Sequence, residues 1–196
     1  MMRRVPLAIL LASLLGAAGC GFEPLYAQRE GRVDVPEQLQ KIRIGEISAP
    51  VPDVLAEFDY RPENARSSQI LRNYLLDDLS PRGIPAQSEY VLNIRLIEPR
   101  TNLAIDRSDA VIRYGYSVTA SFALNDAGGR TVYSGSTTSS TTFEASTSEF
   151  ATVSSQRDAR DRVMQEISAN IRNQLAVFFH GQQRQRAARP DAAAAR

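Results

Sequence analysis

Apolar and polar residues alternate in several stretches of the chain, and this period of two predicts β-strands. The longest alternation runs over 111–124, where every second residue is apolar or aromatic and the residues between are mostly small or polar. Shorter alternations predict strands over 41–47 and 90–97. Each predicted strand therefore has one side suited to a core and one side suited to water.

Turn-forming residues over 125–129 follow the longest alternation and predict a hairpin. The chain continues from about Arg130 into a run of Ser, Gly and Thr over 134–142, a composition that also suits a low-complexity linker. However, Thr favours strands, and Phe143 follows the run directly. We therefore expect an exposed strand that pairs antiparallel with the strand before the turn.

Two segments change to steps of three and four residues, which predicts helices with one apolar side. The first spans 66–79 and ends at a Ser-Pro pair. The second follows Ser146 and Glu149, which have capping-box spacing. Its apolar stripe is clear only from about Ala159, which indicates an interruption near 154–155. The stripe consists of Val163, Met164, Ile167, Ile171, Leu175 and Phe178.

The order strand, helix, three strands, helix predicts one α+β domain over 41–182, in which two helices pack on one face of a mixed four-stranded sheet. Residues 20–40 read as an anchor and a tether before this domain. Residues 183–196 are rich in Ala and Arg and show no periodicity, so we expect a disordered tail there.

Residues 1–19 are typical of a lipoprotein signal peptide. A charged start precedes an apolar run that ends in small residues and is too short to span a bilayer. Cys20, the only cysteine of the chain, follows directly. We therefore expect cleavage before Cys20, a diacylglycerol on its sulfur and an N-acyl chain on its amine. The alternative is an ordinary secretory leader whose removal leaves a lone thiol.

The chain carries 23 basic and 22 acidic residues and is therefore nearly neutral. A nucleic-acid-binding domain shows a strong basic excess, so this balance argues against nucleic acid as a partner. Lys41 is the only lysine, and the remaining basic residues are arginines. An arginine-rich chain suits phosphate or carboxylate recognition, although genome composition explains it equally well.

Residues with catalytic or metal-binding chemistry are few. His180 is the only histidine and is expected at the end of the last helix, where a cation favours the helix dipole. Asp77 and Asp78, and Asp106 and Asp109, are read as solvated carboxylates, because no apolar setting that would shift their pKa values is evident. With Cys20 acylated, too few ligands remain for a metal site. We expect no cofactor and no enzymatic activity.

Several arginines follow the predicted strands. Arg95 and Arg113 fall on polar strand faces, and Arg130 opens the strand after the turn, so their guanidinium groups are expected to gather at one end of the sheet. Such a cluster could bind the phosphates of a lipid headgroup. The alternative is an ordinary solvated face in which arginines pair with Glu98 or Asp109.

The segment Gly19-Cys20-Gly21-Phe22-Glu23-Pro24-Leu25-Tyr26 resembles the start of mature LptE-family lipoproteins, which assemble lipopolysaccharide, in their alphaproteobacterial form. Tyr114 and Tyr116 in a long strand also fit this family, as does Ser148-Glu149-Phe150-Ala151 at the start of a long terminal helix. The resemblance covers 20–182.

The resemblance implies a domain that sits as a plug inside an LptD-type β-barrel of the outer membrane and helps to insert lipopolysaccharide into the outer leaflet. Gly21 rather than Asp after Cys20 resembles the sorting signal for the outer membrane, which implies anchoring on its periplasmic side. The candidate lipopolysaccharide contacts Arg95, Arg113 and Arg130 come from strand position and not from the family. Two alternatives stay open, an auxiliary lipoprotein of a lipid-transporting ABC system and a lipid-anchored hydrolase.

Overall fold

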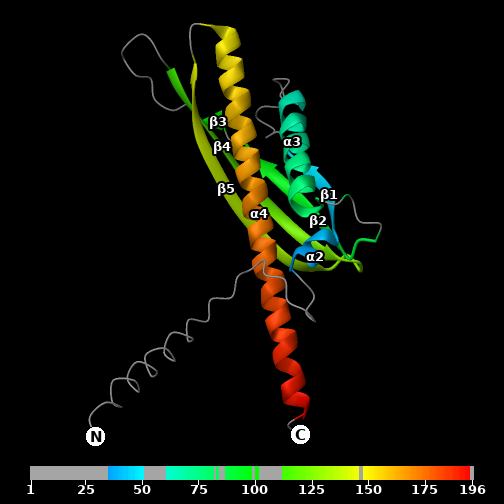
Figure 1. Ribbon diagram of the computed structural model, residues 1–196. Helices are drawn as coiled ribbons and strands as arrows, with labels where there is room; N and C mark the ends of the chain where they lie inside the picture. The colour runs from blue at the N-terminus through cyan, green and yellow to red at the C-terminus, as the bar shows by residue number, and fades with distance from the viewer. Residues whose placement is uncertain are drawn as a thin grey trace, which may run out of the picture.

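The computed structural model describes residues 35–50, 61–81, 83, 87–98, 100–101, 112–145 and 148–194. In this part of the chain a mixed sheet carries two long helices on one face (Figure 1). The predicted α+β architecture and its element order are confirmed, with two short elements, α2 and β3, added. The elements are α2 (Val35–Gln40), β1 (Ile42–Ser48), α3 (Arg61–Leu79), β2 (Tyr90–Ile97), β3 (Arg100–Thr101), β4 (Ile112–Asp126), β5 (Thr131–Ala145) and α4 (Glu149–Ala194).

The sheet combines one parallel pair with antiparallel pairs. β1 lies parallel to β2, and α3 provides the crossover that a parallel pair requires. β4 lies antiparallel to β2 on one side and to β5 on the other. β3 pairs with β4 through Arg100 and Tyr116, in the register set by Ile97 and Thr119, so β3 prolongs the line of β2. The β4–β5 hairpin is the longest feature of the sheet.

The core lies between the sheet and the two helices. Leu71 and Leu75 of α3 are fully buried, as are Leu92 of β2 and Leu124 of β4. Every second strand residue and every third or fourth helix residue contributes, as the hydrophobic pattern predicted. The predicted stripe of α4 is also confirmed: Val163, Met164, Ile167, Ile171 and Leu175 are buried, and Phe178 packs half-buried beside the buried Phe179.

Small residues of β5 allow α4 to lie close to the strand. A Cβ atom on Gly135 would approach Phe122 Cζ and Gln174 Oε1 to 2.6 Å each, so the contact leaves no room for a side chain. The Ser139 hydroxyl donates to Glu166 of α4 over 2.6 Å. The Ser/Thr-rich run is therefore a strand of the sheet and not a linker.

Helix side chains reach both outer strands of the sheet. Arg72 of α3 donates to the carbonyl oxygen of Gly45 in β1 over 2.6 Å. Gln174 of α4 donates to the carbonyl oxygen of Ser136 in β5 over 3.2 Å. Main-chain acceptors at two outer-strand positions are thereby occupied from within the same chain.

Several predictions at element ends were wrong. α4 runs without interruption through 154–155 and continues to Ala194, so 183–194 is helical and not disordered. Ala, Gln and Arg favour helices, and a segment already fixed by packing propagates without a new nucleation step. The tether prediction also missed α2, whose Leu39 enters the core. Ser148 caps α4 by accepting from the Ala151 amide over 3.4 Å, and Ser146 lies outside the described residues.

Candidate partner-binding face

The sheet face opposite the helices is rich in hydroxyl groups. Its residues alternate with the core residues along β4 and β5, and most are exposed. Between Arg113 and Asp126 on β4, and between Arg130 and Glu144 on β5, the strands carry no charged residue. We name this surface the hydroxyl face; it comprises Ser117, Thr119, Ser121, Ser134, Ser136, Thr138, Ser140 and Thr142.

The hydroxyl face is a regular array of short donors and acceptors. Thr119 and Thr138 lie directly opposite each other, and their Oγ1 atoms are 2.9 Å apart. Ser117 donates to the carbonyl oxygen of Ser139 over 3.5 Å. Each hydroxyl can both donate and accept, so the face suits a polar, uncharged partner surface.

Arg95 lies beside this face on β2. Its neighbours in the same row of the sheet are Ser48 of β1, Ser121 of β4 and, one strand further, Ser136 of β5. Arg95 is exposed, and its side chain makes no hydrogen bond or ion pair with the residues that the structure describes. Its guanidinium group is therefore available to an anionic group that approaches the open side of the sheet.

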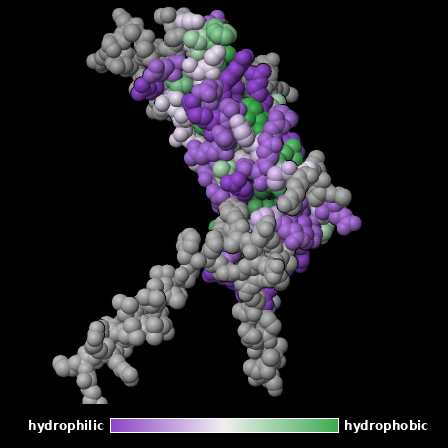
Figure 2. All heavy atoms as spheres, viewed as in Figure 1, coloured by the Kyte–Doolittle hydropathy of each residue, from purple (hydrophilic) through white to green (hydrophobic). Residues whose placement is uncertain are grey.

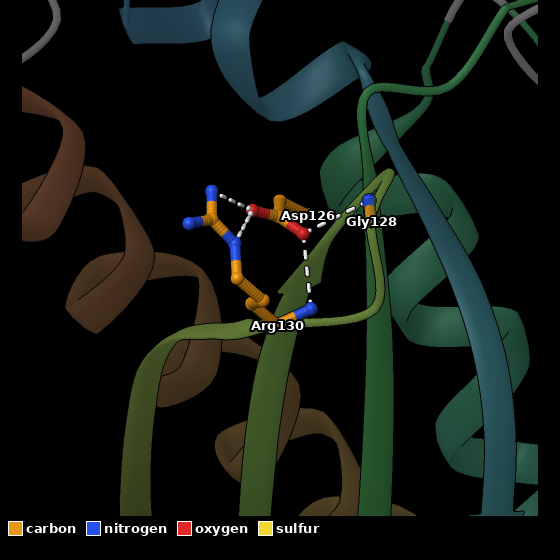
Figure 3. A network of polar contacts seen from close by, with 3 residues as sticks. All are labelled: Asp126, Gly128 and Arg130. Atoms are coloured by element: carbon orange, nitrogen blue, oxygen red, sulfur yellow. Dashed lines mark hydrogen bonds and ion pairs between the residues drawn. The ribbon is translucent and has the colours of Figure 1, made fainter.

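The other two candidate arginines are held in ion pairs. Arg113 contacts its cross-strand neighbour Glu144 over 2.7 Å, and both side chains are largely exposed. Arg130 contacts Asp126 through Nε at 3.0 Å and through Nη2 at 2.8 Å (Figure 3). A carboxylate partner reduces the ability of either arginine to bind an anion.

The arginines do not gather at one end of the sheet, so that prediction was wrong. Arg130 lies at the hairpin turn beside Asp126, whereas Arg113 lies near the far end of β4. At about 3.4 Å per residue the two are roughly 40 Å apart. Of the two carboxylates named as alternative partners, Glu98 accepts from the Tyr116 hydroxyl over 2.9 Å, and Asp109 lies outside the described residues.

Asp126 organises the turn. Its carboxylate accepts from the amides of Gly128 at 2.9 Å and of Arg130 at 3.0 Å, in addition to the Arg130 side chain (Figure 3). These hydrogen bonds hold the pKa of Asp126 below its usual range. The bond from the Arg130 amide has the largest effect, and the bond from the Arg130 side chain has the next largest. This network fixes the hairpin and thereby the register of the hydroxyl face.

Two polar clusters between the helices and the sheet were not found from the sequence. Asp78 accepts from Ser168 over 2.6 Å and from Arg172 over 2.9 Å, so it is a half-buried structural residue and not a solvated carboxylate. Tyr116 lies half-buried against Glu98, with the buried Arg160 over its ring at 5.9 Å. Burial, followed by the charge of Glu98, raises the pKa of Tyr116. Both clusters form between elements that are far apart in the sequence, so only the folded structure reveals them.

The remaining chemistry-bearing residues are placed as follows. His180 lies within α4 and not at its end, because the helix continues. Cys20, Asp106 and Asp109 lie outside the described residues. Among the residues that the structure describes, no group of His, Cys, Asp and Glu could hold a metal ion, and no helix is long and apolar enough to cross a bilayer.

The helix-covered side of the molecule presents a mostly hydrophilic surface (Figure 2). Hydrophobic residues show at the end where α4 begins, and Phe150 in that region is 80% exposed. Ile97, on the open side of the sheet beside Thr119, is 49% exposed. Large apolar side chains are thus exposed at separate places.

Comparison with known proteins gives a family and a fold. A family model described as LptE, lipopolysaccharide-assembly, matches residues 55–175. A lipoprotein structure from Caulobacter crescentus is 23% identical with a TM-score of 0.58, over 76% of this chain and 96% of that one. This likeness shows the fold.

Two further solved structures are more distant. A minor lipoprotein from Acinetobacter baumannii is 16% identical with a TM-score of 0.47, over 70% of this chain and 92% of that one. Rare lipoprotein B from Shewanella oneidensis is 14% identical with a TM-score of 0.44, over 71% and 98%. No curated protein sequence matches the chain.

Proposed function

Because the chain belongs to the LptE family of lipopolysaccharide-assembly proteins, we propose that it assembles with an LptD-type β-barrel as its plug. In this role it is a non-catalytic lipoprotein that helps to insert lipopolysaccharide into the outer leaflet of the outer membrane. Cys20 carries the acyl chains and holds the domain on the periplasmic side. Three chains anchor a protein far more firmly than one marginal chain does.

The hydroxyl face is the observation that carries the plug proposal. The lumen of a transmembrane barrel is polar, so a plug needs hydrogen-bonding groups more than apolar area. On β4 and β5 the face offers such groups without a charge that would have to be desolvated on docking. Thr119 and Thr138 at its centre are the residues expected to lie deepest in this interface.

Arg95 is the proposed phosphate contact for lipopolysaccharide. It differs from Arg113 and Arg130 in having no carboxylate partner among the described residues. An arginine without a partner gains a charge-assisted bond from a phosphate, whereas a paired arginine must first give up its carboxylate. We therefore expect Arg95→Gln to weaken lipopolysaccharide binding by the purified protein several-fold, and Arg113→Gln to leave it nearly unchanged.

Affinity purification from membranes tests the plug proposal. We expect the wild-type chain to recover a large β-barrel in near-equal amount, and the double variant Ser121→Asp, Thr138→Asp to lose most of it. The matched control is Ala151→Asp with Gln165→Asp, two exposed positions of α4 on the helix side. Equal barrel recovery by both double variants would remove the hydroxyl face from the interface.

Depletion of the protein provides the cellular measurement. Less lipopolysaccharide at the cell surface, together with a misfolded barrel, is the expected result. Copurification with inner-membrane transport components and no barrel would instead support an auxiliary lipoprotein of a lipid-transporting ABC system. We expect the variant His180→Ala to keep every phenotype of the wild type. Loss of a phenotype would support the alternative of a lipid-anchored hydrolase.

A further inference from the structure

The C-terminal part of α4 extends beyond the sheet. Phe179 is the last fully buried residue in the part of the helix whose side chains are described, 149–186, and its ring packs edge-on against Tyr90, the first residue of β2, at 5.3 Å. Beyond this point Figure 1 shows the helix leaving the end of the sheet. We name residues 181–194 the arm; at 1.5 Å per residue it is about 21 Å long.

The arm has the composition of a cationic helix that binds an anionic surface. It contains Arg184, Arg186 and Arg189 against one acid, Asp191, and it has no aromatic residue and no Leu, Ile, Val or Met. Arg186 is exposed. A helix without large apolar side chains gains little from entering hydrocarbon or an apolar groove. Its available chemistry is the attraction of guanidinium groups to phosphate.

The arm leaves the domain at the end where the chain enters it. Leu39 of α2, the first described helix, lines one cavity together with Leu79 of α3 and Arg172 of α4. α2 begins at Val35, which follows Cys20 closely in the sequence. A stretch of that length spans at most about 50 Å when fully extended. An acyl anchor on Cys20 therefore limits this end of the domain to about 50 Å from the bilayer surface, a range that includes direct contact.

We propose that the arm lies against the acidic phospholipid headgroups of the membrane that holds the anchor, with the exposed Arg186 as a phosphate contact. The proposal rests on the acyl anchor of the proposed function. Two contacts, the anchor and the arm, would fix the orientation of the domain as well as its distance from the bilayer. Attraction of this kind is screened by salt and depends on lipid charge.

Energy transfer to labelled lipid headgroups tests the proposal on the mature acylated protein, reconstituted in vesicles that contain about one-third phosphatidylglycerol. Gln185→Cys provides a donor site on the arm, and Ala151→Cys provides a reference site near the other end of α4. We expect strong transfer from position 185 and weak transfer from position 151. Transfer from 185 should fall in vesicles of phosphatidylcholine alone and in 0.5 M salt.

The charge variant is Arg186→Gln with Arg189→Gln, which keeps helix-forming side chains. We expect the ratio of membrane-bound to free arm to drop about tenfold or more, since each arginine near an anionic surface contributes severalfold. The matched control, Arg113→Gln with Arg157→Gln, removes the same charge elsewhere and should leave transfer unchanged. Equal transfer from the wild type and the charge variant would overturn the proposal.

The labelling step separates failure of the arm from failure of the anchor. Cys20 is the only native cysteine, so an acylated chain with Gln185→Cys has one reactive thiol. Two reactive thiols per chain would overturn the anchor of the proposed function. One reactive thiol without charge-dependent transfer would overturn the arm proposal alone.

Discussion

The two faces of the sheet are built from alternate residues of the same strands and have opposite properties. On the helix side, Val118 and Phe122 of β4 are buried in the core. On the other side, Thr119 and Ser121 lie on the hydroxyl face. A shift of one residue in the pairing of β4 would exchange the two sets. The residues that build the core and those that form the hydroxyl face therefore occupy interleaved positions of one segment and can be altered separately.

The largest expected difference between the two sides is the loss of stability when one side chain on each side is replaced. Ile167→Ala removes a fully buried side chain of α4 and should cost about 2–5 kcal/mol of unfolding free energy, because the cavity closes only in part. Thr138→Val on the hydroxyl face should change stability by less than about 0.5 kcal/mol. Chemical denaturation of both variants measures the contrast. Similar losses would mean that the open face also carries packing energy.

A smaller effect is expected where the helix side has no spare room. Gly135→Ala places a methyl group 2.6 Å from Phe122 Cζ, so the aromatic ring or α4 must move. We expect a loss of about 1–3 kcal/mol, as is usual for overpacking. Ser134→Ala, the preceding residue on the exposed side, is the control and should be nearly neutral. Equal stability of both variants in a urea titration would contradict the close contact of α4 with β5.

Tyr116 on the helix side should make stability depend on alkaline pH. Its pKa is raised by burial, so the folded protein keeps the phenol neutral while the unfolded chain ionises above about pH 10. The stabilisation is complete below that pH and is lost as the pH rises toward the folded pKa. Unfolding free energies between pH 8 and 11 should fall more steeply for the wild type than for Tyr116→Phe. Parallel curves would argue against burial of the hydroxyl group.

The smallest expected effect concerns the turn that fixes the register of both faces. The pKa of Asp126 is lowered by Arg130, so its contribution is present above the ordinary carboxyl pKa of about 4 and is lost as the pH falls through the lower folded value. Asp126→Asn should remove this part of the acid dependence. Thermal melts between pH 2 and 6 provide the measurement, and an unchanged pH profile would show that the turn network does not contribute.

The periodicities in the sequence were sufficient to predict the main elements and the core. The alternation over 111–124 and the steps of three and four residues in the long helix follow from burial of one side, which is a local property of the pattern. α2 was missed because six residues are too few to show a period, and they are held by Leu39 in a core made by distant elements. The helical arm was missed because an exposed helix needs no apolar stripe.

The candidate site was predicted only in part. The position of Arg95 on a polar strand face followed from alternation, but its lack of a carboxylate partner depends on which strands lie beside it. The separation of Arg113 and Arg130 could have been obtained by counting from the turn, since residues at equal distances from a hairpin loop lie opposite each other. The clusters at Asp78 and Tyr116 join residues from helices and strands far apart in sequence, and no local pattern indicates them.

The contacts of Arg72 and Gln174 with the outer strands have a consequence for copies of the protein that meet at high concentration. A strand from another molecule that added to β1 at Gly45 or to β5 at Ser136 would have to displace a side-chain donor already in place. Growth of the sheet into polymers is therefore opposed at these two positions, while the open side stays accessible. These contacts restrain self-association without placing a charged residue on the open side of the sheet.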